Sequence, residues 1–117
     1  MYEHFRIRLG TAKQEEFHVL LLDNKHRVIE EKMITLGTLN QSLVHPREIF
    51  APAIELRAAS VILIHSHPSG DTKPSKQDIE ITKRLSDVGE IMGIKVLDHI
   101  IIGDGYFSFV DNGIMPV

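Results

Sequence analysis

The first half of the chain alternates between short apolar runs and polar breaks. Residues 17–23 (FHVLLLD) form a run of large apolar side chains, and residues 27–35 (RVIEEKMIT) are rich in β-branched residues. With NKH between them, these runs predict a β-hairpin. After the polar TLNQS stretch, residues 45–59 look helical from Pro46, which is tolerated in a first turn. Pro52 removes a backbone donor, so we expect it to kink or restart that helix.

The second half predicts a strand, a long helix and two more strands. Residues 60–64 are apolar and β-branched without alternation, which is typical of a central strand covered on both faces. A helix is expected from Ser75 to about Met92, with Gly93 placed to end it. Its apolar residues recur at helical spacing: Ile81, Leu85, Val88 and Met92. KVLDHIII, Gly-Asp-Gly and YFSFV then predict a strand, a turn and a closing strand.

This order of elements predicts an α/β (α+β) fold with a mixed β-sheet flanked by helices. The length of 117 residues is that of one domain, 1–117, with one core. Apolar residues make up 43% and charged residues 25%, as in ordinary folded proteins.

Charge and composition narrow the class of protein. The net charge of -3, without a window rich in Lys and Arg, disfavours direct nucleic-acid binding by this domain. No cysteine is present, so any metal must be bound through nitrogen and oxygen. Because there is neither a signal-peptide core nor an apolar run long enough to cross a bilayer, we expect a cytoplasmic protein without membrane contact.

Two histidines stand at the end of the predicted central strand. His65 and His67 are two residues apart, so their side chains project to the same side if the strand persists to Pro68. A lone histidine there would be an ordinary hydrogen-bonded residue. A His-x-His pair at the carboxyl end of a buried strand suits a metal site equally well.

Ser75 and Asp78 open the second helix with the spacing of a capping box. The helix phase places Asp78 within roughly 20 to 80° of the apolar stripe, so its carboxylate leans toward the sheet. An inward carboxylate needs a partner, and a cation beside two histidines would supply it. His65, His67 and Asp78 would leave one position of a tetrahedral Zn²⁺ open for water, which makes hydrolysis the first reaction to expect.

Such a site also needs a general base, and the HExxH motif of many zinc proteases is missing. Glu15 and Glu16, directly before the first predicted strand, are the candidates. The pattern by itself favours a solvated pair of charges at these positions.

The spacing of five residues resembles the JAMM, or MPN-plus, metalloprotease signature. His65, His67 and Pro68 form His-x-His-Pro, seven residues separate His67 from Ser75, and Asp78 follows three positions on. HSHPSGDTKPSKQDIEITKRL and LDHIIIGDGYFSF are more closely similar to RadC-like bacterial proteins, and the similarity extends over essentially the whole chain. The resemblance implies the MPN/JAB-like fold of the JAB-like deubiquitinase superfamily, a layered architecture like that of cytidine deaminases.

The resemblance also implies roles for these residues. His65, His67 and Asp78 would be the ligands of one zinc ion per chain, and Ser75 the donor that steadies a tetrahedral intermediate. An upstream Glu would be the proton shuttle in the hydrolysis of a peptide or isopeptide bond. The substrate would be a protein or peptide of unknown identity.

The position of that acid in RadC-like sequences corresponds to Glu15. Glu16 is the fallback general base, since a one-residue slip changes the face that the acid occupies. His99 could orient a ligand or the substrate, or could be a structural residue with its own hydrogen bond. Asn40, Ser42 and Arg47 could line a substrate groove, although capping and loop packing explain them as well.

Other functions remain in competition with a zinc peptidase. The alternative is a non-catalytic or DNA-repair-associated interaction module that retains the metal site. The DNA repair label of RadC relatives suggests such a link, but the net negative charge of this chain does not support it. A zinc nucleoside deaminase is excluded in its usual form because it needs cysteine ligands. Full-length RadC-like proteins carry an N-terminal helix-hairpin-helix region, which we expect to be absent from this chain. A sheet edge near the termini is compatible with a homodimer.

Overall fold

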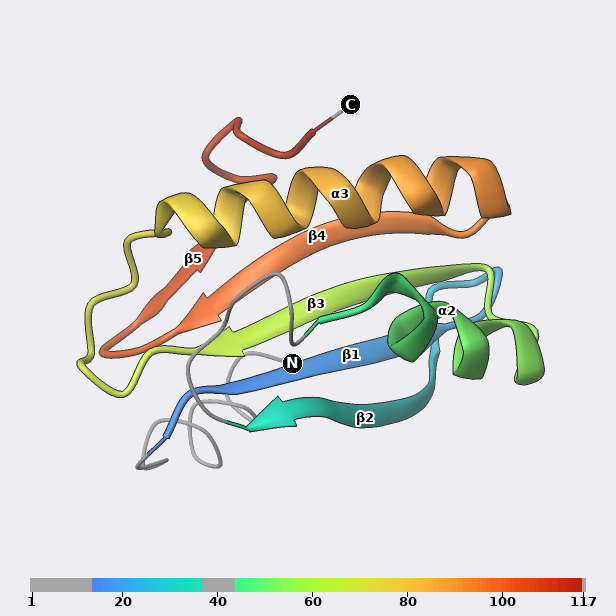
Figure 1. The fold of residues 1–117 in the computed structure, drawn as a ribbon, viewed down its shortest axis with the longest axis horizontal. Coiled ribbons are helices and arrows are strands. Elements are labelled where there is room, and N and C mark those ends of the chain that lie inside the picture. Colours follow the sequence, from blue (N-terminus) through green and yellow to red (C-terminus); the bar gives the residue numbers. More distant parts are fainter. Residues whose placement is uncertain (1–13, 37–43, 117) are drawn as a thin grey trace.

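The computed structural model describes residues 14–36 and 44–116 (Figure 1). Within these residues, five strands form one sheet in the order β2-β1-β3-β4-β5. The strands are β1 (Glu16–Leu22), β2 (Val28–Leu36), β3 (Ser60–Ser66), β4 (Lys95–Ile102) and β5 (Tyr106–Ser108). β3 and β4 are parallel and the other neighbours are antiparallel. The predicted mixed sheet of an α+β fold is therefore confirmed.

The predicted hairpin and central strand are both present. β1 and β2 pair antiparallel, and the Asp23 carboxylate closes their turn by accepting hydrogen bonds from the Lys25 and Arg27 N–H groups at 2.8 and 2.9 Å. β3 lies in the middle of the sheet between β1 and β4. The TLNQS stretch, with Asn40 and Ser42, lies outside the described residues.

The first described helix, α2 (Pro46–Glu55), runs through Pro52 as one element. The predicted restart at this proline is wrong, and so is the extension of the helix to residue 59. Burial of Ile49, Phe50 and Ala53 in the core holds the helix on both sides of the proline, so packing outweighs the missing hydrogen bond. The helix ends at Glu55 with Leu56 as its C-cap, and Arg57 then adopts a left-handed φ of 56°.

The second described helix, α3 (Lys76–Met92), begins and ends as predicted. Ser75 caps its N-terminus, and Gly93 ends it with a φ of 72°. The prediction that Met92 faces the core is wrong: it is 42% exposed, because residues 90–93 are all exposed and the last turn lies outside the core. β5 is also shorter than predicted, since the Phe109 N–H donates to the His99 carbonyl and the chain then turns.

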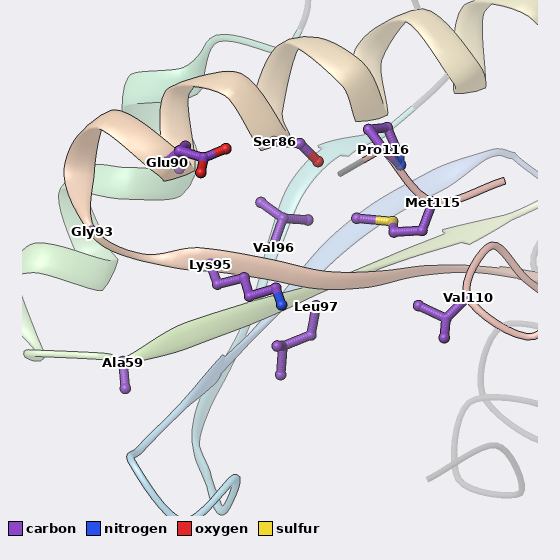
Figure 2. Close-up of a pocket in the computed structure, with 11 residues that line it drawn as sticks. Ala59, Ser86, Glu90, Gly93, Lys95, Val96, Leu97, Val110, Met115 and Pro116 are labelled. Carbon is purple, nitrogen blue, oxygen red and sulfur yellow. The ribbon is translucent and has the colours of Figure 1, made fainter. Parts of the chain in front are cut away.

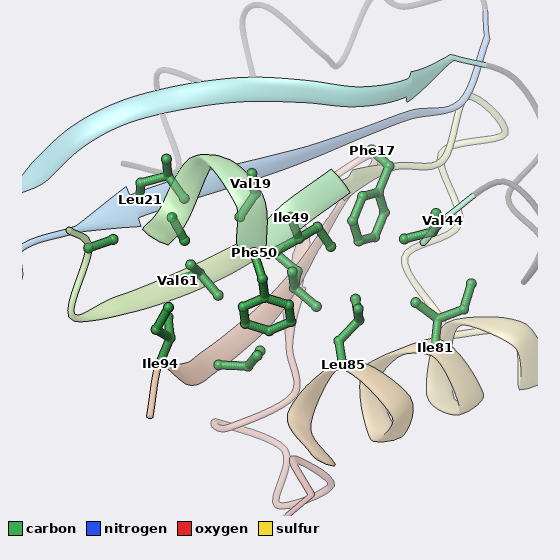
Figure 3. Close-up of a cluster of buried hydrophobic side chains, with 14 residues drawn as sticks. Phe17, Val19, Leu21, Val44, Ile49, Phe50, Val61, Ile81, Leu85 and Ile94 are labelled. Carbon is green, nitrogen blue, oxygen red and sulfur yellow. The ribbon is translucent and has the colours of Figure 1, made fainter. Parts of the chain in front are cut away.

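Both helices pack on the same face of the sheet, and the main core fills the space between (Figure 3). Odd-numbered residues of β1 and β3 face this core: Phe17, Val19, Leu21, Val61 and Leu63. Even-numbered residues of the same strands, such as Leu20 and Ile64, belong to a second apolar cluster. The alternation means that Glu15 and His65, at the ends of these strands, share the helix-covered face.

Within residues 14–36 and 44–116, no helix combines the length and the hydropathy needed to span a membrane.

Candidate metal centre

The two histidines of the His-x-His pair lie together at the carboxyl end of β3. The strand ends at Ser66, but the His67 N–H still donates to the Ile102 carbonyl of β4 at 2.8 Å. This bond keeps the strand direction for one more residue. The His65 and His67 rings consequently lie on one side, with their centroids 4.7 Å apart.

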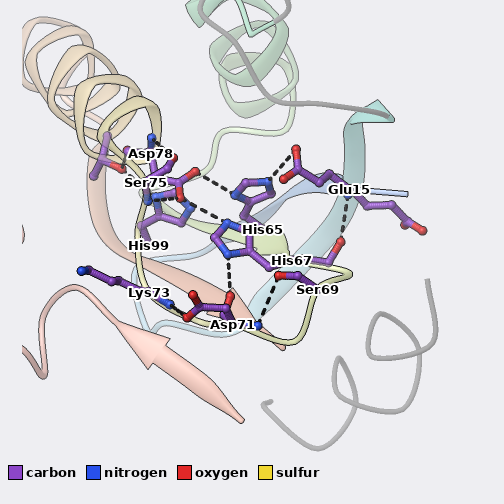
Figure 4. A network of polar contacts seen from close by, with 12 residues as sticks. Glu15, His65, His67, Ser69, Asp71, Lys73, Ser75, Asp78 and His99 are labelled. Atoms are coloured by element: carbon purple, nitrogen blue, oxygen red, sulfur yellow. Dashed lines mark hydrogen bonds and ion pairs between the residues drawn. The ribbon is translucent and has the colours of Figure 1, made fainter. Parts of the chain in front are cut away.

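Asp78 is brought to these rings by the first turn of α3. Its side chain is 1% exposed, and Oδ1 lies 3.0 Å from His65 Nδ1 while Oδ2 lies 3.2 Å from His67 Nε2 (Figure 4). The capping box is also formed: the Ser75 N–H donates to Asp78 Oδ2 at 2.7 Å, and the Asp78 N–H donates to Ser75 Oγ at 3.0 Å. Helix capping and convergence on the histidines therefore occur together.

The side chains of Asp78 and His67 stabilise each other's charged forms. Burial raises the pKa of the Asp78 carboxyl, but His65, His67 and the Ser75 N–H together outweigh burial and hold that pKa well below its usual range. The Asp78 carboxylate raises the pKa of His67 against the opposing effect of burial. Asp78 is thus an anion that attracts positive charge to the histidines.

The hydrogen-bond partners of His67 show which nitrogen could bind a metal. His67 Nδ1 lies 2.8 Å from the Asp71 carbonyl oxygen, which can only accept, so Nδ1 carries the hydrogen. Nε2 then faces Asp78 Oδ2, an arrangement that requires either a proton or a cation between them. A carbonyl behind a histidine ring is the usual device that orients a metal-binding imidazole.

Glu15 and Glu16 point in different directions. Glu15 Oε2 lies 3.9 Å from His65 Nε2, whereas Glu16 Oε1 lies 2.9 Å from His18 Nε2. Glu15, His65 and His67 each offer a ligand atom, and these atoms lie within 4.8 Å of one another. The geometry thus places Glu15, rather than the fallback Glu16, beside the predicted site.

The residues present fit a cation. His65 Nδ1, His65 Nε2 and Asp78 Oδ1 are buried and have no hydrogen-bond partner within the part of the chain that the structure describes. The 3.0 Å contact between His65 Nδ1 and Asp78 Oδ1 is an ion-pair distance without hydrogen-bond alignment. Unsatisfied buried polar atoms of this kind are costly, and a bound metal ion would satisfy Asp78 Oδ1 and the one His65 ring nitrogen that it binds.

The sequence comparisons show the family of the domain. A model of the RadC-like JAB domain matches residues 1–114. The chain belongs to the RadC-like JAB domain family. Its predicted family membership and fold are confirmed, and the group of Glu15, His65 and His67 gives this RadC-like domain a candidate metal site.

The chain is similar to UPF0758 proteins from several organisms. It is 56% identical over 116 residues to one from Trichlorobacter lovleyi, covering 98% of this chain and 50% of the relative. It is 53% identical over 116 residues to one from Geobacter sulfurreducens, covering 98% and 51%. A relative from Methanosarcina acetivorans is 49% identical over 107 residues, covering 91% and 47%. The chain therefore spans about half the length of the curated relatives it matches.

Two further residues of the RadC-like domain lie behind Asp78. Thr82 Oγ1 lies 2.6 Å from the Asp78 carbonyl oxygen and 2.6 Å from His99 Nδ1. Thr82 was not among the predicted site residues, and its signal in the sequence is its position four residues after Asp78, on the same helix face. His99, which the sequence predicts as a possible orienting residue, is completely buried.

A separate cavity of about 620 Å³ lies away from this chemistry, between α3, β4 and residues 115 and 116 (Figure 2). Ser86, Glu90, Lys95, Val96 and Met115 are among its lining residues. Among the residues that the structure describes, the lining contains no histidine and none of the predicted site residues, so we do not place the reaction there.

Proposed function

We propose that this RadC-like domain is a zinc-dependent hydrolase of peptide or isopeptide bonds. The observation that carries the proposal is the convergence of His65, His67 and Asp78, with buried polar atoms that lack a hydrogen-bond partner among the described residues, and with the Glu15 carboxylate beside them. Imidazole and carboxylate ligands without sulfur suit zinc, and three protein ligands are typical of a catalytic zinc site.

In this proposal His65, His67 and Asp78 hold the metal. Their side chains are only 2%, 12% and 1% exposed, so they are held in place by the surrounding protein. Zinc, when bound, supplies a Lewis acid that lowers the pKa of water and polarises a carbonyl group.

Glu15 is the proposed general base and acid. Its side chain is 29% exposed, so it faces both His65 and the solvent from which a substrate arrives. A carboxylate at this position can accept a proton from the attacking water and return it to the leaving amine.

Ser75 is the proposed donor to the developing oxyanion. Its Oγ accepts the Asp78 N–H at 3.0 Å, so the hydroxyl hydrogen can be donated to a substrate oxygen. The residue is exposed at the start of α3, where a substrate carbonyl can approach. The proposed substrate is a protein or peptide, and direct nucleic-acid binding plays no part in the proposal.

The first test is metal content. Protein purified without added metal is expected to contain about one zinc per chain, and both His67→Ala and Asp78→Ala are expected to lose it, because each removes one of three ligands. Elemental analysis by mass spectrometry measures this directly. Equal zinc in all three proteins would contradict the proposed site.

The second test separates hydrolysis from metal binding. The zinc-loaded protein is incubated with mixed peptides and lysine-linked isopeptides, and newly released amines are identified by mass spectrometry. Glu15→Gln should retain zinc but lower turnover by about 100-fold or more, since general acid–base catalysis contributes that much. Glu16→Gln is the matched control and should behave like the wild type. Turnover unaffected by Glu15→Gln would exclude Glu15 as the general base, and no turnover in any protein would favour the non-catalytic module.

A further inference from the structure

The contacts of the Thr82 hydroxyl fix the position of its hydrogen. Its oxygen lies 2.6 Å from the Asp78 carbonyl oxygen, which can only accept, so the single hydroxyl hydrogen lies between these two atoms. The second contact, also 2.6 Å, then requires His99 Nδ1–H to donate to Thr82 Oγ1. A continuous chain of hydrogen bonds therefore runs from β4 through Thr82 to the backbone of Asp78.

His99 is held rigidly at the sheet end of this chain. Its ring stacks on Phe109 with centroids 4.7 Å apart and planes at 19°, and meets Phe17 edge-on at 5.8 Å. Its backbone N–H donates to Asp98 Oδ1 at 2.7 Å. With the ring fixed on both sides, His99 can serve as an anchor for α3.

We propose that Thr82 and His99 are positioning residues that fix Asp78 relative to His65 and His67. The inference rests on the proposed function, in which Asp78 is a metal ligand. His65 belongs to β3, His67 directly follows that strand and Asp78 belongs to α3, so their separation depends on how firmly the first turns of α3 are attached to the sheet. Groups that orient metal ligands typically change metal affinity by about 10- to 100-fold when removed.

A hydroxyl that bonds to the carbonyl four residues earlier is common in helices and has no functional meaning by itself. The second bond, to a completely buried histidine on another element, is what distinguishes Thr82. Ser86 provides the internal comparison, because its hydroxyl is buried one turn later on α3 and has no hydrogen-bond partner within the residues that the structure covers.

The first test measures the His99 tautomer in the metal-free full chain. Long-range ¹H–¹⁵N NMR spectra should show His99 protonated on Nδ1, with Nε2 unprotonated. Thr82→Val, which keeps the shape but removes the acceptor, should shift His99 toward the Nε2–H tautomer, and Thr82→Ser should preserve the wild-type spectrum. An Nε2–H tautomer in the wild type would overturn the inference.

The second test measures zinc affinity by competition with a chromophoric chelator. Thr82→Val should weaken zinc binding by about 10-fold or more. Thr82→Ser and the control Ser86→Ala should stay within about twofold of the wild type, since neither removes the bond to His99. His99→Phe keeps the aromatic stack, removes the donor and should weaken binding like Thr82→Val, so it replaces that variant if Thr82→Val does not fold.

The outcomes distinguish this inference from the proposed function. Wild-type zinc affinity in both Thr82→Val and His99→Phe overturns the positioning role and leaves the hydrolase proposal standing. Weakened affinity, combined with no turnover in any zinc-loaded protein, supports the positioning role and refutes the hydrolase. A wild-type protein that binds no zinc overturns both.

Discussion

Asp78 combines two roles that the sequence predicts separately. One carboxylate oxygen accepts the Ser75 N–H and also lies 3.2 Å from His67 Nε2, while the other lies 3.0 Å from His65 Nδ1. Capping fixes the carboxylate in the first turn of α3, so little conformational entropy remains to be lost when a cation binds. The structural role thus prepares the proposed chemical one.

His99 gives a prediction about pH. Burial, followed by the nearby positive potential of His65, lowers the pKa of His99 from 6.5 to about 3. Between these values the unfolded chain binds a proton that the folded protein does not, so the contribution of neutral His99 to stability is complete above pH 6.5 and is lost as the pH falls. We expect the wild type to lose roughly 2 or 3 kcal/mol more than His99→Phe between pH 7 and pH 4.5.

Urea unfolding of both proteins at several pH values checks this expectation. His67, whose raised pKa acts in the opposite sense as the pH rises, is present in both proteins and cancels in the comparison. Parallel pH profiles for wild type and His99→Phe would contradict the predicted burial of a neutral histidine.

At the scale of elements, the approach of α3 to β4 depends on Gly89. A Cβ added at this residue would lie 2.5 Å from the Ile94 carbonyl oxygen, 3.4 Å from Phe50 and 3.4 Å from Val96. The Ile94 N–H also donates to the Gly89 carbonyl at 2.9 Å, which closes the end of the helix. The turn from α3 into β4 is therefore packed around a residue without a side chain.

Gly89→Ala should consequently destabilise the protein. In an ordinary helix interior this change is favourable by about 1 kcal/mol. Here the new methyl group meets backbone, and overpacking of that kind costs about 1 to 3 kcal/mol, so we expect a net loss of stability. Thermal unfolding of Gly89→Ala and Gly89→Ser tests the sign, with the larger side chain expected to be worse. A higher melting temperature for Gly89→Ala would show that α3 can move away from Ile94.

At the scale of the whole molecule, the candidate site draws on β1, β3 and α3. Glu15 precedes β1, His65 lies near the end of β3, His67 directly follows that strand, and Asp78 belongs to α3. These residues come together only in the folded chain. A metal bound there must therefore stabilise the fold, because the unfolded chain lacks the site.

Zinc is expected to raise the melting temperature of the metal-free protein. Ligand at 100 times its dissociation constant stabilises a folded protein by about 2.7 kcal/mol, which corresponds to a shift of several degrees for a domain of this size. The shift should disappear in His67→Ala and persist in His45→Ala, which removes an exposed histidine outside the site. An equal shift in all three proteins would indicate binding to surface histidines instead.

Local rules account for most of the fold and for the three proposed ligands. The apolar runs predict the hairpin, the central strand and α3, and the capping pattern predicts the start of α3 at Ser75. They fail at Pro52 and Met92, where the packing of the surrounding elements decides the outcome. Neither helix length around a proline nor exposure of a last turn is a property of the local sequence.

The sequence by itself determined the family, the strand and helix order, and the pairing of His65 and His67 on one face, because period-two alternation and capping are local. The resemblance already favours Glu15 over Glu16, but only the tertiary structure shows that Glu15 lies beside His65 while Glu16 contacts His18, since these contacts depend on which face of β1 is covered by helices. The tertiary structure also decided the place of His99. Leu97 is an extra residue in β4, between the pairs Val61–Val96 and Ile62–Asp98. This bulge turns His99 rather than Asp98 toward Thr82, and a register shift is fixed by the neighbouring strand, not by the strand that carries it.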